Sequence, residues 1–268
     1  MTELTAVPGG QTLDDAMAGL GGDYGKMMAE FWAGGPTTVI PPGQFGWLWR
    51  DYVLRFLPEG HVSSSGEVDA HFLSALDLGI RLFEGGRTTW GSKTRHMQSR
   101  PIQEVRNRFR DEMLGGFMGP TLGSMWMPYQ TFDFVSPPFA DFPSGHSHFS
   151  RAFQNAMTKW FGPDIGRRSL PVPYMLQQDT LLQMAPLFVR VEHQPELFMT
   201  FKFPAGSSEI ETGVVPASEV IFEFDTWEDV ATSCGLSRLW GGIHARSAHT
   251  ASQAMADALN EKVEAVWA

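Results

Sequence analysis

The sequence predicts a mainly α-helical bundle with one small β excursion. Several stretches repeat apolar residues at spacings of three and four, most clearly at residues 67–86. Residues 197–224 instead carry two short runs rich in Phe, Ile and Val, which indicate a β-hairpin. Pro and Gly separate the helical stretches without marking a domain boundary. We therefore expect a single domain over residues 1–268, with lead-in helices at 1–60 and the main bundle at 61–268.

The N-terminal elements follow from caps and breakers. Thr12 is a candidate N-cap for a helix over residues 12–33, and Gly34-Gly35-Pro36 ends it. A turn at Pro41-Pro42-Gly43 precedes a second, apolar helix. In the third helix, at residues 67–86, six apolar residues fall near one face. We expect them to pack in the core: Val68, Phe72, Leu73, Leu76, Ile80 and Phe83.

The second half of the chain alternates helices with irregular segments. Residues 100–113 read as a helix with proline in its first turn, and 111–143 as a long loop rich in Gly, Pro and aromatic residues. A loop of that length in a compact domain is often functional. Helical character returns at 147–161 and again from Thr226, where Asp229 completes a pattern that resembles a capping box.

Charge and cysteine content exclude several classes of protein. The formal net charge is −10 and the isoelectric point is about 5.2, which argues against general nucleic-acid binding. The single cysteine, Cys234, rules out an intrachain disulfide and favours a reducing compartment. No signal-peptide pattern and no apolar window of membrane-spanning length is visible. We therefore expect a cytoplasmic protein without a membrane span.

Three short segments concentrate the residues that can bind an anion. Lys93 and Arg100 are seven residues apart, a spacing that can place both on one helix face. Pro143-Ser144-Gly145-His146 precedes a helix, whose N-terminus favours negative charge. Arg238 and His244 follow near the C-terminus. Cations, a hydroxyl, a bare backbone N–H and two imidazoles together predict a pocket for a tetrahedral oxyanion.

These segments together resemble the signature of the vanadium-dependent haloperoxidases and the type-2 phosphatidic acid phosphatases. Lys93 to Pro101, Pro143 to His146 and Ser237 to His244 occur in the family's order. The resemblance runs from roughly Phe31 to Ala254 and is closer to the haloperoxidase branch. It implies the helical bundle of that superfamily and vanadate as cofactor, with phosphate able to occupy the same site.

The resemblance also implies roles for these residues. His244 bonds the vanadium, or attacks phosphorus in a phosphatase, and His146 serves as general acid–base. Five groups hold the oxyanion: Lys93, Arg100, Ser144, Gly145 and Arg238. The implied substrates are hydrogen peroxide, halide and an organic acceptor. Trp90 and Phe139 resemble aromatic residues of the chloride-oxidising branch, although simple wall packing explains them equally well.

Two departures from the family pattern affect these expectations. The family places an Asp four residues after the metal-binding His, where this chain has Ala248. Backbone, water or His249 would then have to orient His244, although His249 reads more readily as a surface residue. The chain is also short for a haloperoxidase, which predicts a homo-oligomer or a partner chain that supplies the missing half. An acid phosphatase or phosphotransferase, or a non-catalytic oxyanion-binding subunit, remains as an alternative function.

Overall fold

The computed structural model describes residues 22–33, 41–56, 70–165 and 199–267, and it is mainly helical. The helices are α2 (Gly22–Phe31), α3 (Pro41–Phe56), α4 (Ala70–His96), α5 (Pro101–Arg108), α6 (Gly145–Phe161), α8 (Trp227–Trp240) and α9 (Arg246–Trp267), with a 3-10 turn η1 (Gly123–Met125). The strands are β1 (Met113–Leu114), β2 (Thr121–Leu122), β3 (Thr200–Phe203) and β4 (Val220–Glu223). In the described part of the chain, no helix is long and apolar enough to cross a membrane.

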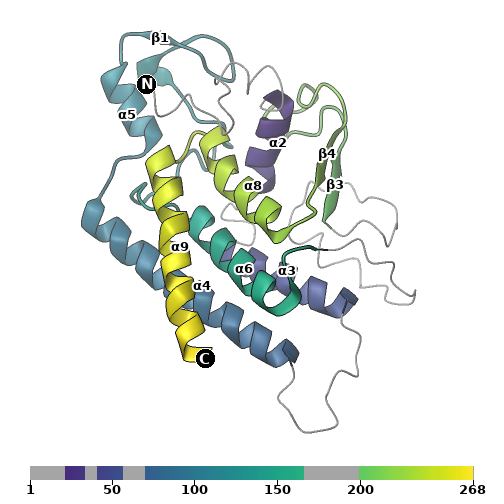
Figure 1. Cartoon of the computed structure of the whole chain (residues 1–268). Coiled ribbons are helices and arrows are strands. Elements are labelled where there is room, and N and C mark those ends of the chain that lie inside the picture. Colours follow the sequence, from purple (N-terminus) through teal and green to yellow (C-terminus); the bar gives the residue numbers. More distant parts are fainter. Residues whose placement is uncertain (1–21, 34–40, 57–69, 166–198, 268) are drawn as a thin grey trace, which may run out of the picture.

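Helix α6 lies at the centre of the bundle. It packs against α8, α4, α9 and α3, and α2 lies along α8 on the far side (Figure 1). The N-terminus of α6 carries the Pro-Ser-Gly-His segment, so the ends of its neighbours determine what lies around that segment. The bundle therefore brings together segments that lie far apart in the sequence.

Both small sheets are antiparallel pairs. β3 pairs with β4, with Thr200 opposite Glu223 and Phe203 opposite Val220, which confirms the hairpin expected near residues 197–224. β1 pairs with β2 inside the segment expected to be a long loop, a pairing too short to leave a sequence signal. The remainder of residues 111–143 is largely irregular, as expected.

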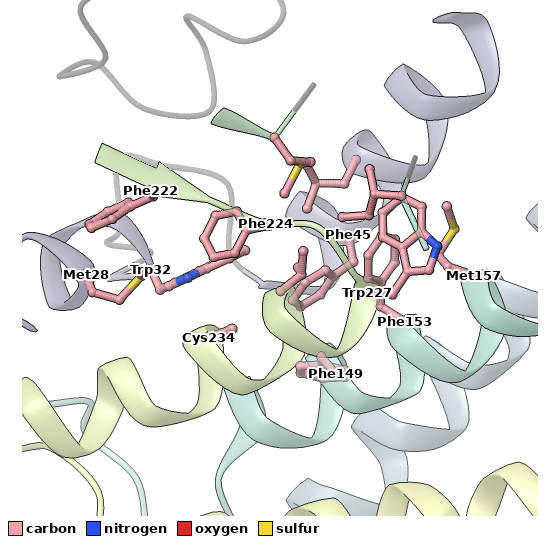
Figure 2. Close-up of a cluster of buried hydrophobic side chains, with 14 of the residues drawn as sticks. Met28, Trp32, Phe45, Phe149, Phe153, Met157, Phe222, Phe224, Trp227 and Cys234 are labelled. Carbon is pink, nitrogen blue, oxygen red and sulfur yellow. The ribbon is translucent and has the colours of Figure 1, made fainter. Parts of the chain in front are cut away.

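The largest apolar cluster lies between α3, α6, α8 and the β3–β4 pair (Figure 2). Phe153 of α6 lies between Phe45 and Trp227, with ring centroids 5.0 and 5.5 Å away. Phe222 and Phe224 extend the cluster toward α2. Because offset and edge-to-face aromatic contacts have preferred geometries, this cluster fixes how α6 and α8 sit against each other. The packing of α6 against α8 therefore also fixes the ends of these two helices at the candidate site.

The apolar stripe expected to face the core on the third helix is mostly on the outside. Phe72, Leu76 and Phe83 of α4 are 60%, 44% and 69% exposed, whereas Leu73 and Ile80 are half-buried, so that expectation was wrong. Val68 lies outside the described residues. Helix periodicity identifies a face but does not say whether this chain or another molecule covers it.

The buried side of α4 is polar instead. Asp77 and Arg81 are almost fully buried, and Arg81 Nε donates to Asp77 Oδ2 at 3.1 Å. Asp77 also accepts from the indole N–H groups of Trp160 and Trp267, at 2.9 and 2.8 Å. Glu264 of α9 accepts from Arg81 Nη2 at 2.5 Å. Since a buried ion pair needs such partners to offset desolvation, this network fixes the rotation of α4.

Helix boundaries differ in detail from those expected. α3 begins at Pro41 itself, because proline fits the first helical turn where no N–H is needed. α6 begins at Gly145 rather than 147, with Ser144 as its N-cap, and the Thr226–Asp229 capping box of α8 is confirmed. The expected N-cap Thr12 lies outside the described residues.

Candidate functional site

The three sequence motifs converge where several helix ends meet. Lys93 comes from the last turn of α4, Arg100 is the N-cap of α5, and Ser144 is the N-cap of α6. Arg238 lies in the last turn of α8, and His244 in the link to α9. The helix ends before Arg100, so Lys93 and Arg100 do not share a helix face as expected. Tertiary packing brings them together instead.

Arg100 is held rigidly and keeps two donors free. Its Nε donates to the Phe139 carbonyl at 2.9 Å, and its Nη1 donates to the Ile243 carbonyl at 2.8 Å. Nη1 also lies 3.2 Å from His244 Nε2. Nη2 is buried and has no hydrogen-bond partner among the described residues. Because an unpaired buried charged donor is costly, this nitrogen is suited to an anionic ligand beside His244.

Lys93 braces the loop in front of α6. Its Nζ, buried between α4 and this loop, donates to the carbonyls of Ala140, Asp141 and Pro143 at 2.8, 3.0 and 2.5 Å. An ammonium group has three N–H donors, so these contacts use all of them. Lys93 thus supplies positive charge to the site while its hydrogen bonds fix the backbone that leads into Ser144.

The C-terminal end of α2 contacts two of the expected site residues. Arg238 donates from Nη2 to the Ala29 carbonyl and from Nη1 to the Ala33 carbonyl, the latter at 3.5 Å. His146 Nε2 lies 2.8 Å from the Trp32 carbonyl, so this nitrogen carries the proton in that contact. Helix C-termini attract cations, and α2 therefore closes one side of the site.

Ser144 is oriented by a chain of buried polar groups. Its Oγ accepts from the Ser147 backbone N–H at 3.4 Å and from the Ser147 hydroxyl at 3.0 Å. Ser147 Oγ lies 2.8 Å from His249 Nδ1. His249 is only 8% exposed, so its reading as a surface residue was wrong. With its lone pairs engaged, Ser144 has its own O–H left to donate to an anion at the α6 N-terminus.

His244 has a carboxylate partner that the sequence reading missed. Asp141 is fully buried, and its Oδ1 is hydrogen-bonded to His244 Nδ1. Asp141 Oδ2 accepts from the Ala245 backbone N–H at 3.2 Å. Backbone, water or His249 had been expected to take the place of the missing carboxylate at position 248. The structure instead provides an aspartate from the loop before α6.

Burial lowers the pKa values of the basic side chains at the candidate site. It lowers the pKa of Lys93 to about 7, with Arg100 lowering it further and Asp141 opposing the shift. Burial also lowers the pKa of Arg100 and of Arg238 to about 10. The pKa values of His146 and His244 lie well below 6.5, through burial first and neighbouring cations second. Both imidazoles are therefore neutral at pH 7, and a bound anion would offset the crowded positive charge.

Two aromatic residues stand at the edge of the site. The Trp90 and Phe139 rings are 5.4 Å apart, and both are about two-fifths exposed. Lys93 Nζ lies 5.8 and 5.2 Å from their centroids, and the Arg100 guanidinium carbon lies 5.1 Å from that of Phe139. The two rings expected to line a substrate pocket therefore flank the cationic groups.

The groups that sequence reasoning missed lack any regular spacing. Asp141 precedes His244 by 103 residues, and the only signal was a lone acidic residue inside the apolar run Phe139-Ala140-Asp141-Phe142-Pro143. A carboxylate buried there requires a partner, which the run itself does not name. His148 points away from the site as expected and packs beside Gly85 of α4. Within the described residues, no group of three His, Cys, Asp or Glu side chains is placed to hold a metal ion.

Comparisons with known proteins agree with the helical fold. Crystal structures of a holo-type and an apo-type bacterial vanadium-dependent chloroperoxidase match with TM-scores of 0.62 at 20% identity, over 93% of this chain. The crystal structure of the first bacterial vanadium-dependent iodoperoxidase matches with a TM-score of 0.55 at 18% identity, over 90% of this chain. The matches span only 44–46% of those relatives. No curated protein matches the sequence.

A family model provides the remaining comparison. Residues 75–267 match the model described as the VCPO second helical-bundle domain. This range contains all three motifs and begins within α4. It covers well over half of the sequence, and the resemblance to the haloperoxidase branch is thereby confirmed. The chain belongs to the VCPO family, and residues 75–267 match its second helical-bundle domain.

Proposed function

We propose that this chain binds vanadate and oxidises halide with hydrogen peroxide to halogenate organic acceptors. The observation that carries the proposal is the buried Nη2 of Arg100, which has no partner among the described residues. It lies on the same guanidinium group whose Nη1 is 3.2 Å from His244 Nε2. A tetrahedral oxyanion beside that imidazole nitrogen satisfies the free donors and the local charge. The residues present therefore fit vanadate.

The proposed roles follow from the donors that remain available. His244 would offer the Nε2 lone pair to the metal, because Asp141 holds the Nδ1 side, and Arg100 Nη1 would give up its 3.2 Å contact with Nε2. Arg100 Nη2, the Ser144 hydroxyl and the Gly145 N–H donate to the oxyanion. Lys93 contributes charge rather than hydrogen bonds. Arg238 donates from the N–H groups of Nη1 and Nη2 that the Ala33 and Ala29 carbonyls do not use, since its Nε donates to Ser237 Oγ. When bound, vanadate would act as a Lewis acid that activates peroxide toward halide.

Proton transfer is assigned to His146. Its Nε2 is engaged with the Trp32 carbonyl, so exchange at that nitrogen requires this contact to open. Its neutral state at pH 7 is the form that accepts a proton. Trp90 and Phe139 exclude water from one side of the site and present apolar ring faces to halide or acceptor.

A phosphatase activity in the same pocket is the second candidate. The absence of a carboxylate at position 248 had argued against a nucleophilic His244. The contact between Asp141 and His244 Nδ1 removes that objection, since a carboxylate orients the ring and raises its basicity. Phosphate and vanadate are both tetrahedral oxyanions, so the donor set does not separate them.

A paired assay on metal-stripped protein tests the proposal. One arm contains orthovanadate, hydrogen peroxide, bromide or chloride, and a phenolic acceptor. The other contains p-nitrophenyl phosphate without vanadate. Vanadate-dependent halogenation that is lost in His244→Ala supports a haloperoxidase, and phosphate release that vanadate inhibits supports the phosphatase. Inactivity in both arms, with phosphate still bound, contradicts both enzymatic functions and leaves a binding role.

We also propose that a second copy of this chain covers the outer face of α4. Phe72, Leu76 and Phe83 recur there at spacings of four and seven residues, which is the pattern of a helix-packing seam. Gly79 lies within the stripe, and a Cβ added there would meet no atom of the described residues within 4 Å, so a second helix can approach closely. The polar network around Asp77 and Arg81 prevents α4 from turning this face inward.

The area on this face is sufficient for a weak dimer. A fully exposed aromatic or leucine side chain presents roughly 150–250 Å². The three exposed fractions then sum to about 350 Å² per copy, or about 700 Å² in an isologous pair, and flanking residues of α4 add the remainder of a weak interface. Light scattering should give a dimer, and Phe83→Asp should give a monomer. Val214→Asp, at an equally exposed valine of the β3–β4 loop, is the control, and a monomeric wild-type protein contradicts the proposal.

A further inference from the structure

The link between Asp141 and His244 is built from several fixed points. The Asp141 backbone N–H donates to the Gln98 carbonyl at 2.9 Å, and its own carbonyl accepts from Lys93 Nζ at 3.0 Å. Its carboxylate is fully buried and contacts His244 Nδ1 through Oδ1 and the Ala245 N–H through Oδ2. Backbone and side chain are thus both held, which leaves the carboxylate little freedom to move.

We infer that Asp141 is the positioning residue that fixes the tautomer of His244. A buried carboxylate can only accept, so it selects the form of His244 with the proton on Nδ1. The lone pair then resides on Nε2, where it accepts from Arg100 Nη1 at 3.2 Å, so Arg100 favours the same tautomer from the site side. The inference rests on the proposed function, because it identifies what prepares His244 to bind an oxyanion metal centre.

Asp141 therefore replaces the carboxylate that the family resemblance places at position 248. Ala248 is fully buried, and its carbonyl accepts from the Ser144 backbone N–H at 3.1 Å, so the α9 side of His244 is still tied to the site. The orienting carboxylate has moved from α9 to the loop that leads into α6. Lys93 donates hydrogen bonds to that same loop. Its contacts therefore help to fix both the position of the loop and, through Asp141, the orientation of the His244 ring.

Asp141→Asn gives the sharpest test, because the geometry predicts which way the amide must face. The Ala245 N–H cannot change its role, so the amide oxygen must turn toward it. The amide NH₂ then faces His244 Nδ1 and favours the proton on Nε2, which must break the contact that Nε2 makes with Arg100 Nη1 at 3.2 Å. The Asn variant is nearly isosteric with the wild type, yet it should invert the tautomer.

Two readouts separate this inference from the function on which it rests. ¹⁵N NMR of histidine-labelled protein, with the His244 signal identified by its absence in His244→Ala, should show Nδ1–H in the wild type and Nε2–H in Asp141→Asn. Titration calorimetry with orthovanadate should show roughly 10- to 100-fold weaker binding in the variant. If the wild type binds no vanadate, the proposed function fails, while the NMR tautomer still decides the role of Asp141.

Moving the carboxylate from position 141 to position 248 tests whether vanadate affinity can be restored. Asp141→Ala should weaken vanadate binding by a similar factor, and the double variant Asp141→Ala with Ala248→Asp should recover most of it. Phe132→Ala, at an exposed aromatic of the same long loop, should leave affinity unchanged. An Nε2–H tautomer in the wild type, or Nδ1–H retained in a folded Asp141→Asn, would overturn the inference. The wild-type spectrum decides the point even if the variants fail to fold.

Discussion

Replacing Arg100 with lysine keeps the positive charge of the site but removes its planar fork. Arg100 uses Nε and Nη1 to hold the Phe139 and Ile243 carbonyls, and Nη2 remains for the ligand. A hydrogen bond to a charged group contributes about 1.5–3 kcal/mol. Nη2 offers two such N–H donors, and lysine can replace one of them at best. Arg100→Lys should therefore weaken orthovanadate binding by about 1.5–3 kcal/mol, or roughly 10- to 150-fold.

The assay is titration calorimetry with orthovanadate, and with phosphate in parallel. Thermal unfolding without anion checks that the variant folds, since the two carbonyl contacts also tie the start of α5 to the loop before α6 and to the link before α9. Arg108→Lys is the matched control: Arg108 lies on the same helix, its side chain is 73% exposed, and its partner is Glu104 at 2.6 Å. If a folded Arg100→Lys binds vanadate as tightly as the wild type, the free Nη2 does not contact the ligand and the assignment is wrong.

Three further results are expected. Ser147→Ala breaks the chain from His249 to Ser144, and calorimetry should show several-fold weaker vanadate binding; unchanged affinity would mean that Ser144 needs no orientation. Burial lowers the pKa of His148 from 6.5 to about 4, so its contribution to stability is present above pH 6.5 and lost as the pH falls to 4. Between pH 6.5 and 4, the free energy of unfolding measured with urea should fall by up to about 3 kcal/mol less in His148→Met than in the wild type. Parallel pH profiles of the two proteins would contradict this. Burial raises the pKa of Cys234 to about 12, so a thiol reagent should label it only after unfolding; rapid labelling of folded protein would contradict its burial.

Most of the helices and the candidate donor groups could be predicted from the sequence alone. Local signals such as the Thr226–Asp229 capping box and the aromatic runs of β3 and β4 depend on neighbouring residues, and the structure agrees with both. The three motifs carry their own spacing, so Arg100, Ser144 and His244 could be identified before any fold was known. In the structure these segments lie together, and the roles of their residues stay a prediction.

Nonlocal relations were not predictable in the same way. Asp141 and His244 are joined only by the packing of α6 against α9, and no periodicity links them. Likewise, the apolar stripe of Phe72, Leu76 and Phe83 was recognisable, but its direction depended on Asp77 and Arg81 finding partners on α6 and α9. A pattern on one helix cannot report which of its faces the rest of the chain covers.

The central claim is that His244, prepared by its neighbours, anchors an oxyanion in this chain. Titration of the purified protein with orthovanadate, beside His244→Ala, tests it most directly. The account predicts one saturable site per chain in the wild type and loss of tight binding in the variant. Equal binding by both proteins, or no binding by a folded wild type, would contradict it.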